Sequence, residues 1–226
     1  MKVTCVIPAW NEVKLREHCK LPEVVDALKG KVDSIVIVED GSDDETYAIA
    51  SSLPAAVLRH AVNRGQGAAL KTGTIYALQN GADIIVHFDA DGQFRVQDIE
   101  TVIEPIRDGK ADIVFGSRFL DASTKMPLLK KHFIMPLAQF VNRFFFKIKM
   151  SDPQSGFRAL SRRAAEAITW EQDRMAHCSE ILSEAHASGL RISEVPITVL
   201  YSEHGRGLGN GFKILYEMLL AKLNHH

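Results

Sequence analysis

The sequence predicts an α/β fold with one mixed, largely parallel sheet flanked by helices. Short apolar runs alternate with segments whose apolar residues recur at helical spacing, which is the usual sign of β-α-β units. Polar, mostly acidic residues directly follow three of the apolar runs. The chain has 226 residues, 46% hydrophobic and 24% charged, so it is long enough for one substantial core, and one domain is the simplest count.

The apolar runs and the helical patterns give an order of elements along the chain. We expect strands at 3–8, 34–38, 55–58, 84–88 and 112–115, and a strand pair at 191–201 that Pro196 interrupts. We expect helices at 22–28, 44–52, 96–106, 162–168, 179–188 and 211–223. Residues 65–78 are typical of a loop that opens into a helix, because Ala69, Leu70, Gly73 and Ala77 recur at helical spacing.

Cysteine usage and the lack of long apolar stretches bear on the location of the protein. The three cysteines are widely spaced and form no metal-ligand pattern, which fits a reducing compartment without structural zinc. The chain enters its first strand without a basic and apolar leader, and no stretch approaches the roughly 18 apolar residues that span a bilayer. We therefore expect a cytoplasmic protein, peripheral on the cytoplasmic face of a membrane, and no nucleic-acid partner.

The short acidic sequence Asp89-Ala90-Asp91 directly follows the apolar run at 84–88 and precedes Gly92. Two carboxylates one residue apart on a tight turn suit a hard divalent cation such as Mg²⁺ or Mn²⁺, which takes its other ligands from water and phosphate. An ordinary acidic turn is the alternative. Strands 3–8 and 34–38 also run into segments that carry polar residues, 9–12 with Asn11 and Glu12, and 39–44. Because ligands bind beyond the carboxyl ends of strands in open α/β sheets, one site is expected at this edge.

Six motifs in order resemble glycosyltransferase family 2. They are Ile7-Pro8-Ala9-Trp10-Asn11-Glu12, Val38-Glu39-Asp40-Gly41-Ser42, Asn63-Arg64-Gly65-Gln66-Gly67-Ala68-Ala69, Asp89-Ala90-Asp91-Gly92-Gln93, Gly116-Ser117-Arg118 and Asp152-Pro153-Gln154-Ser155-Gly156-Phe157-Arg158-Ala159. Within the family, the chain most resembles the dolichyl-phosphate and undecaprenyl-phosphate sugar synthases. Two motifs are typical of that branch, Ser155-Gly156-Phe157-Arg158-Ala159 and Gly189-Leu190-Arg191-Ile192-Ser193-Glu194-Val195-Pro196-Ile197. The resemblance implies a GT-A (Rossmann-like) fold, a nucleotide-sugar donor and inversion at the anomeric carbon.

The resemblance also implies roles for single residues. Asp40 corresponds to a base-binding aspartate, with a turn or helix cap as the alternative. The rest of the nucleoside pocket is expected from Pro8, Ala9 and Glu12, and the residues that let backbone approach the ligand closely are Gly65 and Gly67. Relatives often carry lysine where this chain has Gln66, which removes one positive charge near the phosphates. The expected metal ligands are Asp91 first, Asp89 shared with the ribose, and Gln93 as a third contact.

A divalent ion on the diphosphate would stabilise the charge of the leaving group. Arg118, Arg158 and Arg206 are candidates to assist, because guanidinium groups pair with phosphate in a bidentate manner. A solvated surface position is the alternative for each. Arg206 falls in a glycine-rich stretch at 202–210, which we expect to be a flexible loop that closes over the donor.

Residues 122–151 hold six Lys or Arg and no Asp or Glu. Their apolar residues recur at helical spacing, which predicts a basic amphipathic segment that lies on an anionic lipid surface. A core-packed helix pair and an oligomer interface are the alternatives. Such a segment suits a polyprenyl phosphate as acceptor.

An acceptor phosphate is already largely ionised at neutral pH and requires no general base. A sugar hydroxyl would require one, for which Asp152 and Glu180 are the candidates. Under the first hypothesis, either residue instead orients a metal or an arginine.

The leading hypothesis is an inverting, metal-dependent glycosyltransferase that uses a GDP-mannose or UDP-glucose type donor and a polyprenyl phosphate. A soluble glycosyltransferase with a saccharide, protein or small hydroxyl acceptor is the second hypothesis. The third is a non-catalytic nucleotide-binding assembly protein. A separate membrane subunit or a homo-oligomer is a further expected partner.

Overall fold

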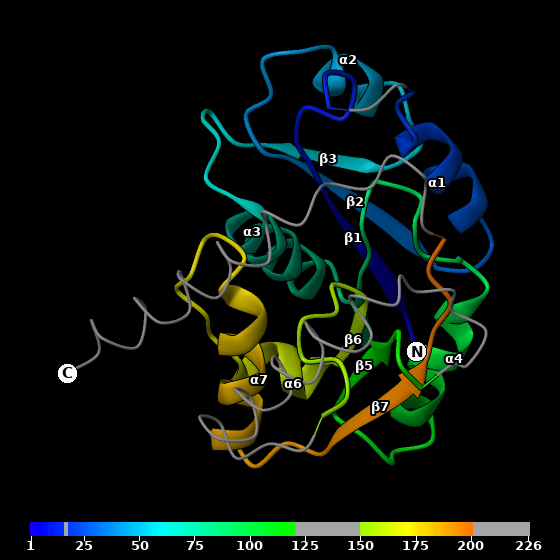
Figure 1. Cartoon of the computed structure of the whole chain (residues 1–226), viewed down its shortest axis with the longest axis vertical. Coiled ribbons are helices and arrows are strands. Elements are labelled where there is room, and N and C mark those ends of the chain that lie inside the picture. Colours follow the sequence, from blue (N-terminus) through cyan, green and yellow to red (C-terminus); the bar gives the residue numbers. More distant parts are fainter. Residues whose placement is uncertain (16–17, 121–149, 201–226) are drawn as a thin grey trace.

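One seven-stranded sheet organises the computed structural model, which describes residues 1–15, 18–120 and 150–200 (Figure 1). The strand order across the sheet is β3-β2-β1-β4-β6-β5-β7. Strand β6 runs antiparallel to β4 and β5, and the other neighbours are parallel. The strands are β1 (Val3–Ala9), β2 (Ser34–Glu39), β3 (Ala56–Arg59), β4 (Ile84–His87), β5 (Ile113–Ser117), β6 (Arg158–Ser161) and β7 (Ile192–Pro196).

The central strands are apolar along their length because both faces of the sheet are covered, as parallel sheets require. In β1, Cys5 and Ile7 face one core and Val6 faces the other, and all three are fully buried. Cys5 lies between Ile35 of β2 and Val86 of β4 in the strand register. The buried central strands therefore fix the positions at which the loops after their carboxyl ends begin.

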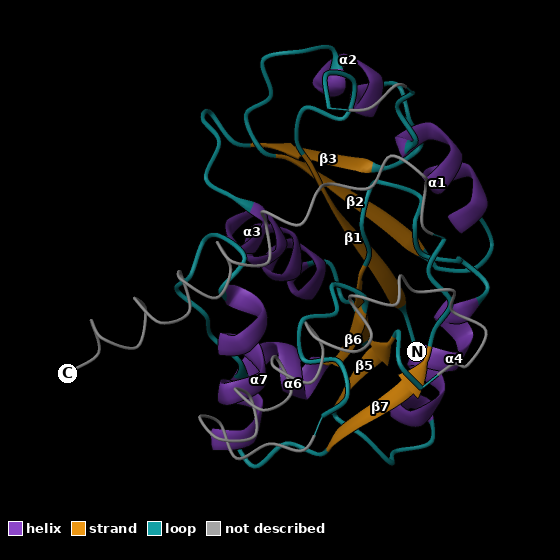
Figure 2. Ribbon diagram, viewed as in Figure 1, coloured by secondary structure: helices purple, strands orange, loops and turns teal. Residues whose placement is uncertain are grey.

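The helices divide between the two faces of the sheet (Figure 2). Helices α1 (Leu21–Leu28), α2 (Thr46–Ser51) and α4 (Asp98–Arg107) contribute to the first core. Helices α3 (Gln66–Gln79), α6 (Arg162–Ala167) and α7 (His177–Ala187) contribute to the second. Each of these helices buries part of its surface, the short α2 and α6 mainly through alanines, and the sheet separates the two cores.

Helix α4 illustrates how the sequence produces this arrangement. Its buried residues Ile99, Val102, Ile103 and Ile106 recur at positions i, i+3, i+4 and i+7, which places them on one face. Acidic residues occupy its first turn and Arg107 its last, which favours the helix dipole. The same pattern in the sequence predicts this helix to within two residues at its start and one at its end.

Strand β6 is an element that the sequence analysis missed. It begins with Arg158, whose charge interrupts the apolar run. Because the strand is only four residues long, it lacks a clear strand pattern. Pro196 ends β7 as expected, and the second half of the predicted strand pair is reduced to one isolated bridge between Phe94 and Val199.

The other predicted elements lie within about three residues of those observed. The helix expected at 211–223, residues 122–149 of the basic segment and the loop at 202–210 fall outside the described residues. Among the described residues, the structure contains no helix with the length and apolarity that a bilayer crossing requires.

Helix α3 packs closely on the sheet at Gly73. A Cβ atom added there would lie 2.3 Å from Val6 Cγ1 and 3.0 Å from Val38 Cγ2. Any side chain at this position would push the helix away from β1 and β2. The glycine therefore sets the distance between α3 and the strands whose ends carry the site.

Gly73→Ala is expected to lower the free energy of unfolding by about 1–3 kcal/mol, because it overpacks a closely packed contact. Ile75→Ala on the exposed side of the same helix is the control, with an expected change within about 0.5 kcal/mol. Urea denaturation measures both, and equal effects of the two substitutions would contradict the close contact.

Candidate active site

The loops after β1 and β2 are joined by hydrogen bonds at the carboxyl edge of the sheet. The Asn11 amide donates to Ser42 Oγ (3.0 Å), and the Asp43 amide donates to Asn11 Oδ1 (3.1 Å). The Glu12 amide donates to Thr46 Oγ1 at 2.8 Å. Two loops that are about thirty residues apart in the sequence therefore form one unit.

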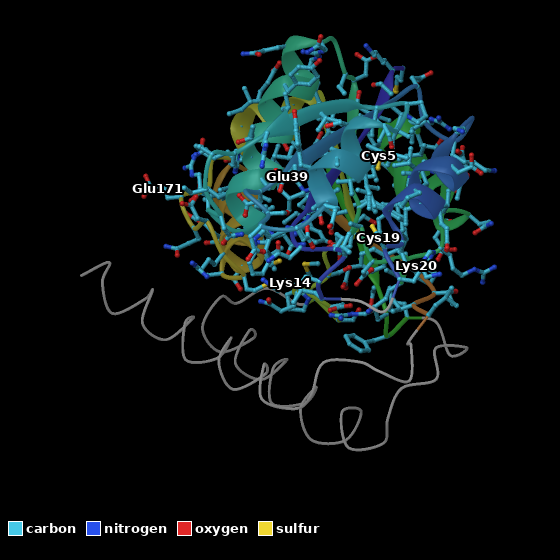
Figure 3. All side chains as sticks on the ribbon, turned by 90° about the horizontal axis from the view of Figure 1, so that it is seen from above. Cys5, Lys14, Cys19, Lys20, Glu39 and Glu171 are labelled. Carbon is cyan, nitrogen blue, oxygen red and sulfur yellow. The ribbon has the colours of Figure 1, made fainter. Side chains whose placement is uncertain are left out.

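Pro8, Ala9 and Glu12 lie at the end of β1, as the sequence predicts. Ala9 and Glu12 are buried and Pro8 is half-buried. Lys14 and Lys20 of the same loop lie along one side of the molecule (Figure 3). A Cβ atom added at Gly92 would lie 3.4 Å from Lys20 Cβ, so this loop also reaches the acidic turn after β4. The contact of these residues with a nucleoside remains a prediction.

Asp40 holds the loop that precedes α3. Its Oδ1 accepts hydrogen bonds from His60 Nδ1 (2.6 Å) and the Arg64 amide (3.0 Å). Its Oδ2 accepts from Asn63 Nδ2 (2.9 Å) and the Gly65 amide (2.6 Å). The residue is 3% exposed and four donors surround its carboxylate. In this conformation the loop before α3 uses the hydrogen-bonding capacity of Asp40. The contact of Asp40 with a base, for which a turn or helix cap was the alternative, stays a prediction.

Gly65 and Gly67 allow a close approach to another part of this chain. A Cβ atom added at Gly65 would lie 2.4 Å from the Asp173 carbonyl oxygen, and one at Gly67 would lie 2.3 Å from that of Gln172. Trp170 Nε1 donates to the Gly67 carbonyl oxygen (2.9 Å). The glycines therefore allow close packing between the start of α3 and residues 170–173, and their approach to a ligand stays a prediction.

Asp89 and Asp91 follow β4 and lie close enough to affect each other. Burial and the neighbouring Asp91 charge raise the pKa of Asp89 to about 7, while the charges of Arg158 and His177 oppose that rise. Asp91 Oδ1 accepts the Gln93 amide hydrogen bond at 3.0 Å, which closes the turn. Two partly buried carboxylates thus share one small region, and the ionised pair is electrostatically unfavourable without a cation.

The side chains around Asp89 restrict its position. Gln66 Nε2, from the first residue of α3, donates to Asp89 Oδ1 at 2.8 Å. On the other side, a Cβ atom added at Gly156 would lie 3.0 Å from Asp89 Oδ2. Three motifs of the sequence therefore meet at one carboxylate.

The donor set of this turn fits Mg²⁺ or Mn²⁺. Asp89 and Asp91 supply hard oxygen donors, and the like charges favour a bound cation. No cluster of three or more His, Cys, Asp or Glu with metal-binding geometry occurs in the part of the chain that the structure describes. A cation held here would take its remaining ligands from water and phosphate, as Mg²⁺ usually does. The structure assigns Gln93 a backbone contact to Asp91, and its part as a third ligand stays a prediction.

Arg158 is fully buried, so in this conformation it does not present its guanidinium to a diphosphate as we expected. Its Nη2 lies 3.3 Å from both His177 Nε2 and Cys178 Sγ, and its Nε and Nη1 have no hydrogen-bond partner among the described residues. Burial opposes ionisation of the Cys178 thiol, but the charges of His177 and Arg158 outweigh it and lower the pKa to about 6. Arg158 therefore affects the acidic turn through its charge, which lowers the pKa of Asp89.

Arg118 and Asp152, both predicted site residues, form a bidentate ion pair. Arg118 Nε donates to Asp152 Oδ2 and Nη2 donates to Oδ1, each at 2.6 Å. Asp152 is 1% exposed, whereas the Arg118 side chain is 29% exposed. Of the alternatives for Asp152, the geometry favours an arginine orienter. Glu180 instead accepts hydrogen bonds from the amides of Glu171 (2.9 Å) and Gln172 (2.8 Å) and braces a loop.

Glu194 is a residue that the sequence analysis did not single out. From β7 it accepts hydrogen bonds from the amides of Ser151 and Asp152, at 2.8 and 2.9 Å. It thereby anchors the chain beside Asp152. A carboxylate next to Val195 and Pro196 in a predicted strand was the available signal. Arg206 lies outside the described residues.

The mixed, mostly parallel sheet with these loops at its carboxyl edge has the architecture of the GT-A fold. Residues 4–169 match the family model described as glycosyl transferase family 2. The chain therefore belongs to glycosyltransferase family 2 and is a glycosyltransferase.

Named relatives cover nearly the whole chain. It is 36% identical to the UDP-N-acetylglucosamine–dolichyl-phosphate N-acetylglucosaminyltransferase of Methanococcus voltae, over 96% of this chain and 95% of that protein. It is 29% identical to the polyprenol monophosphomannose synthase of Mycolicibacterium smegmatis, over 92% and 81%. Glucosyl-3-phosphoglycerate synthase from Mycobacterium tuberculosis, crystallised with Mn²⁺, UDP and glucosyl-3-phosphoglycerate, shares the fold with a TM-score of 0.73 and 18% identity, over 99% of this chain and 79% of that chain.

The raised pKa of Asp89 predicts that the metal-free protein loses stability as the pH rises. The unfolded carboxyl has a pKa near 4, roughly. The folded state therefore holds a proton that the unfolded state has released, and this advantage disappears as the pH rises to about 7. Asp89→Asn removes this term, so between pH 5 and pH 8 its free energy of unfolding should fall by about 1–3 kcal/mol less than that of the wild type.

Urea denaturation in the presence of a chelator measures this difference. Asp108→Asn, at an exposed position after α4, is the control and should keep the wild-type pH profile. If Asp89→Asn also keeps that profile, the carboxyl does not titrate near neutral pH.

Proposed function

We propose that this protein transfers a sugar, with inversion, from a nucleoside-diphosphate sugar to a polyprenyl phosphate at a membrane surface. The observation that carries the proposal is the pair of like charges at Asp89 and Asp91, at the edge of the sheet where the loops after β1 and β4 meet. The names of relatives that act on dolichyl phosphate and form polyprenol monophosphomannose support the choice of acceptor.

Asp89 and Asp91 would hold Mg²⁺ or Mn²⁺ on the donor. When bound, the cation neutralises the negative charge that builds on the departing diphosphate. Asp152 fixes the guanidinium of Arg118, whose partial exposure leaves it accessible to a phosphate group. Arg206 stays a candidate for the same task. The donor of GDP-mannose or UDP-glucose type would place its nucleoside by Pro8, Ala9 and Glu12.

The engagement of the two candidate bases favours a phosphate acceptor over a hydroxyl acceptor. Asp152 binds Arg118 through both oxygens, and Glu180 holds two backbone amides. A hydroxyl nucleophile must give up its proton to a base within hydrogen-bond reach. A phosphate monoester is already largely ionised at neutral pH, so it can attack the anomeric carbon without one.

A lipid-product assay tests the proposal. The full chain, Mn²⁺ or Mg²⁺, a short-chain polyprenyl phosphate and a panel of labelled UDP- and GDP-sugars should yield a labelled product that extracts into organic solvent. Asp91→Asn should lower turnover by about 100-fold or more, because it removes the negative charge of the side chain. The side-chain oxygen that accepts the hydrogen bond of the Gln93 amide is kept. Asp108→Asn is the matched surface control and should retain activity.

Each result of that assay has a definite consequence. Product on a soluble hydroxyl acceptor instead of the lipid would favour the second hypothesis. Binding of a nucleotide without turnover on any acceptor would favour the non-catalytic assembly protein. Unchanged metal-dependent turnover by Asp91→Asn would refute the assignment of the cation to this turn.

We further propose that the protein is peripheral on the cytoplasmic membrane face and that residues 122–151 bind anionic lipid. The full chain should therefore float with anionic vesicles but not with neutral ones, and less at high salt. Replacing Lys130, Lys131, Arg143 and Lys147 with glutamine should lower the bound fraction by about tenfold or more, at about 1 kcal/mol for each cation.

The control replaces the same number of exposed cations near the amino-terminal ends of β2 and β5, away from the carboxyl edge that carries the site. These are Lys29, Lys31, Arg107 and Lys110. This variant should float as the wild type does. Absence of flotation by the wild type would favour a core-packed pair or an oligomer interface for residues 122–151. Flotation that appears only with a membrane protein extract would instead favour a separate membrane subunit.

A further inference from the structure

Gln66 makes the hydrogen bond that links the start of α3 to the acidic turn. Its Nε2 donates to Asp89 Oδ1 at 2.8 Å. Among the described residues this is the hydrogen bond that the Asp89 carboxylate accepts, and the Gly156 backbone closes the space beside Oδ2. The orientation of Asp89 therefore depends on the neutral side-chain amide of Gln66 and on the absence of a side chain at Gly156.

The backbone that carries Gln66 is held from both sides. Asp40 accepts hydrogen bonds from the amides of Arg64 and Gly65, the two residues before it. The Ala68 amide donates to the Asp173 carbonyl oxygen at 3.2 Å. Because the backbone on both sides of Gln66 is held, its Cα position is fixed. The contact between Gln66 and Asp89 is therefore set by the fold.

The type of side chain at position 66 also matters. An amide donates a hydrogen bond without adding charge, so it orients Asp89 and leaves the negative charge of the turn undiminished. An ammonium group in the same place would pair with Asp89 and oppose a cation. A carboxylate would repel Asp89 but add an oxygen ligand for a cation.

We propose that Gln66 is a positioning residue that orients Asp89 for a divalent cation and, because it is neutral, sets the affinity of the turn for that cation. The inference rests on the cation site of the proposed function. It adds that the first residue of α3 controls that site from outside the acidic turn. The link continues through the backbone to Asp40, at the end of β2.

Four variants of the full chain test this inference, with Mn²⁺ alone as the probe. Gln66→Met removes the donor and should weaken Mn²⁺ binding by about tenfold, the usual scale for a group that orients a metal ligand. Gln66→Lys should weaken it by about 100-fold or more, because it adds charge. Gln66→Glu should strengthen it. Gln79→Ala, at the exposed other end of the same helix, should leave it unchanged.

Thermal unfolding without metal supplies a second reading with the opposite sign. Gln66→Lys should raise the midpoint above that of Gln66→Met because the ammonium pairs with Asp89, and Gln66→Glu should lower it because two carboxylates repel. A purely structural role for Gln66 would lower stability and Mn²⁺ affinity together in every variant. Electron paramagnetic resonance of free Mn²⁺ measures the affinity.

The two readings separate the failure of this inference from the failure of the proposed function. If the wild type binds no Mn²⁺, the proposed cation site is wrong, and the order of unfolding midpoints then decides whether Gln66 contacts Asp89. If the wild type binds Mn²⁺ and all three Gln66 variants bind it with the wild-type affinity, Gln66 does not position Asp89 and the inference is overturned.

Discussion

The site depends on the hydrogen bonds that the carboxylate of Asp40 accepts. This carboxylate stands just beyond β2 and accepts four hydrogen bonds from His60 and from the loop that leads into α3. Because that loop is held, α3 begins at a defined place, its glycines pack against residues 172–173, and Gln66 reaches Asp89. One buried carboxylate thereby connects the end of β2 to the acidic turn beyond β4, and removing it would leave two backbone amides, those of Arg64 and Gly65, without their acceptor.

The charges of the site suit the departing anion of the proposed reaction. Burial and the neighbouring charge of Asp91 disfavour ionisation of Asp89, which favours a bound cation. Asp152 holds Arg118, whose side chain is partly exposed. Arg158 is buried, with its guanidinium next to His177 and Cys178. Carboxylates that a hydroxyl acceptor would require as bases already have partners. The same arrangement suits a phosphate that attacks without giving up a proton.

The elements that the sequence predicts best are those with a repeating apolar pattern. Strands β1, β2 and β4 are buried on both faces, so their apolar runs are continuous, and α4 shows a clear helical stripe. Strand β6 has no such pattern because Arg158 begins it, and its antiparallel insertion between β4 and β5 depends on pairing with strands more than forty residues earlier. The acidic turn and Arg118 were also predicted, since their residue types stand beside strand ends.

By itself the sequence determined the α/β class, the order of most elements, the family resemblance and the set of acidic and basic residues at one edge of the sheet. These features are local patterns of polarity and short motifs. Only the tertiary structure decided the partners: Asp40 with the loop before α3, Gln66 with Asp89, Asp152 with Arg118, and Arg158 buried where an exposed arginine was expected. The physical reason is that each partner lies more than twenty residues away or is decided by burial, and both depend on how the strands and helices pack.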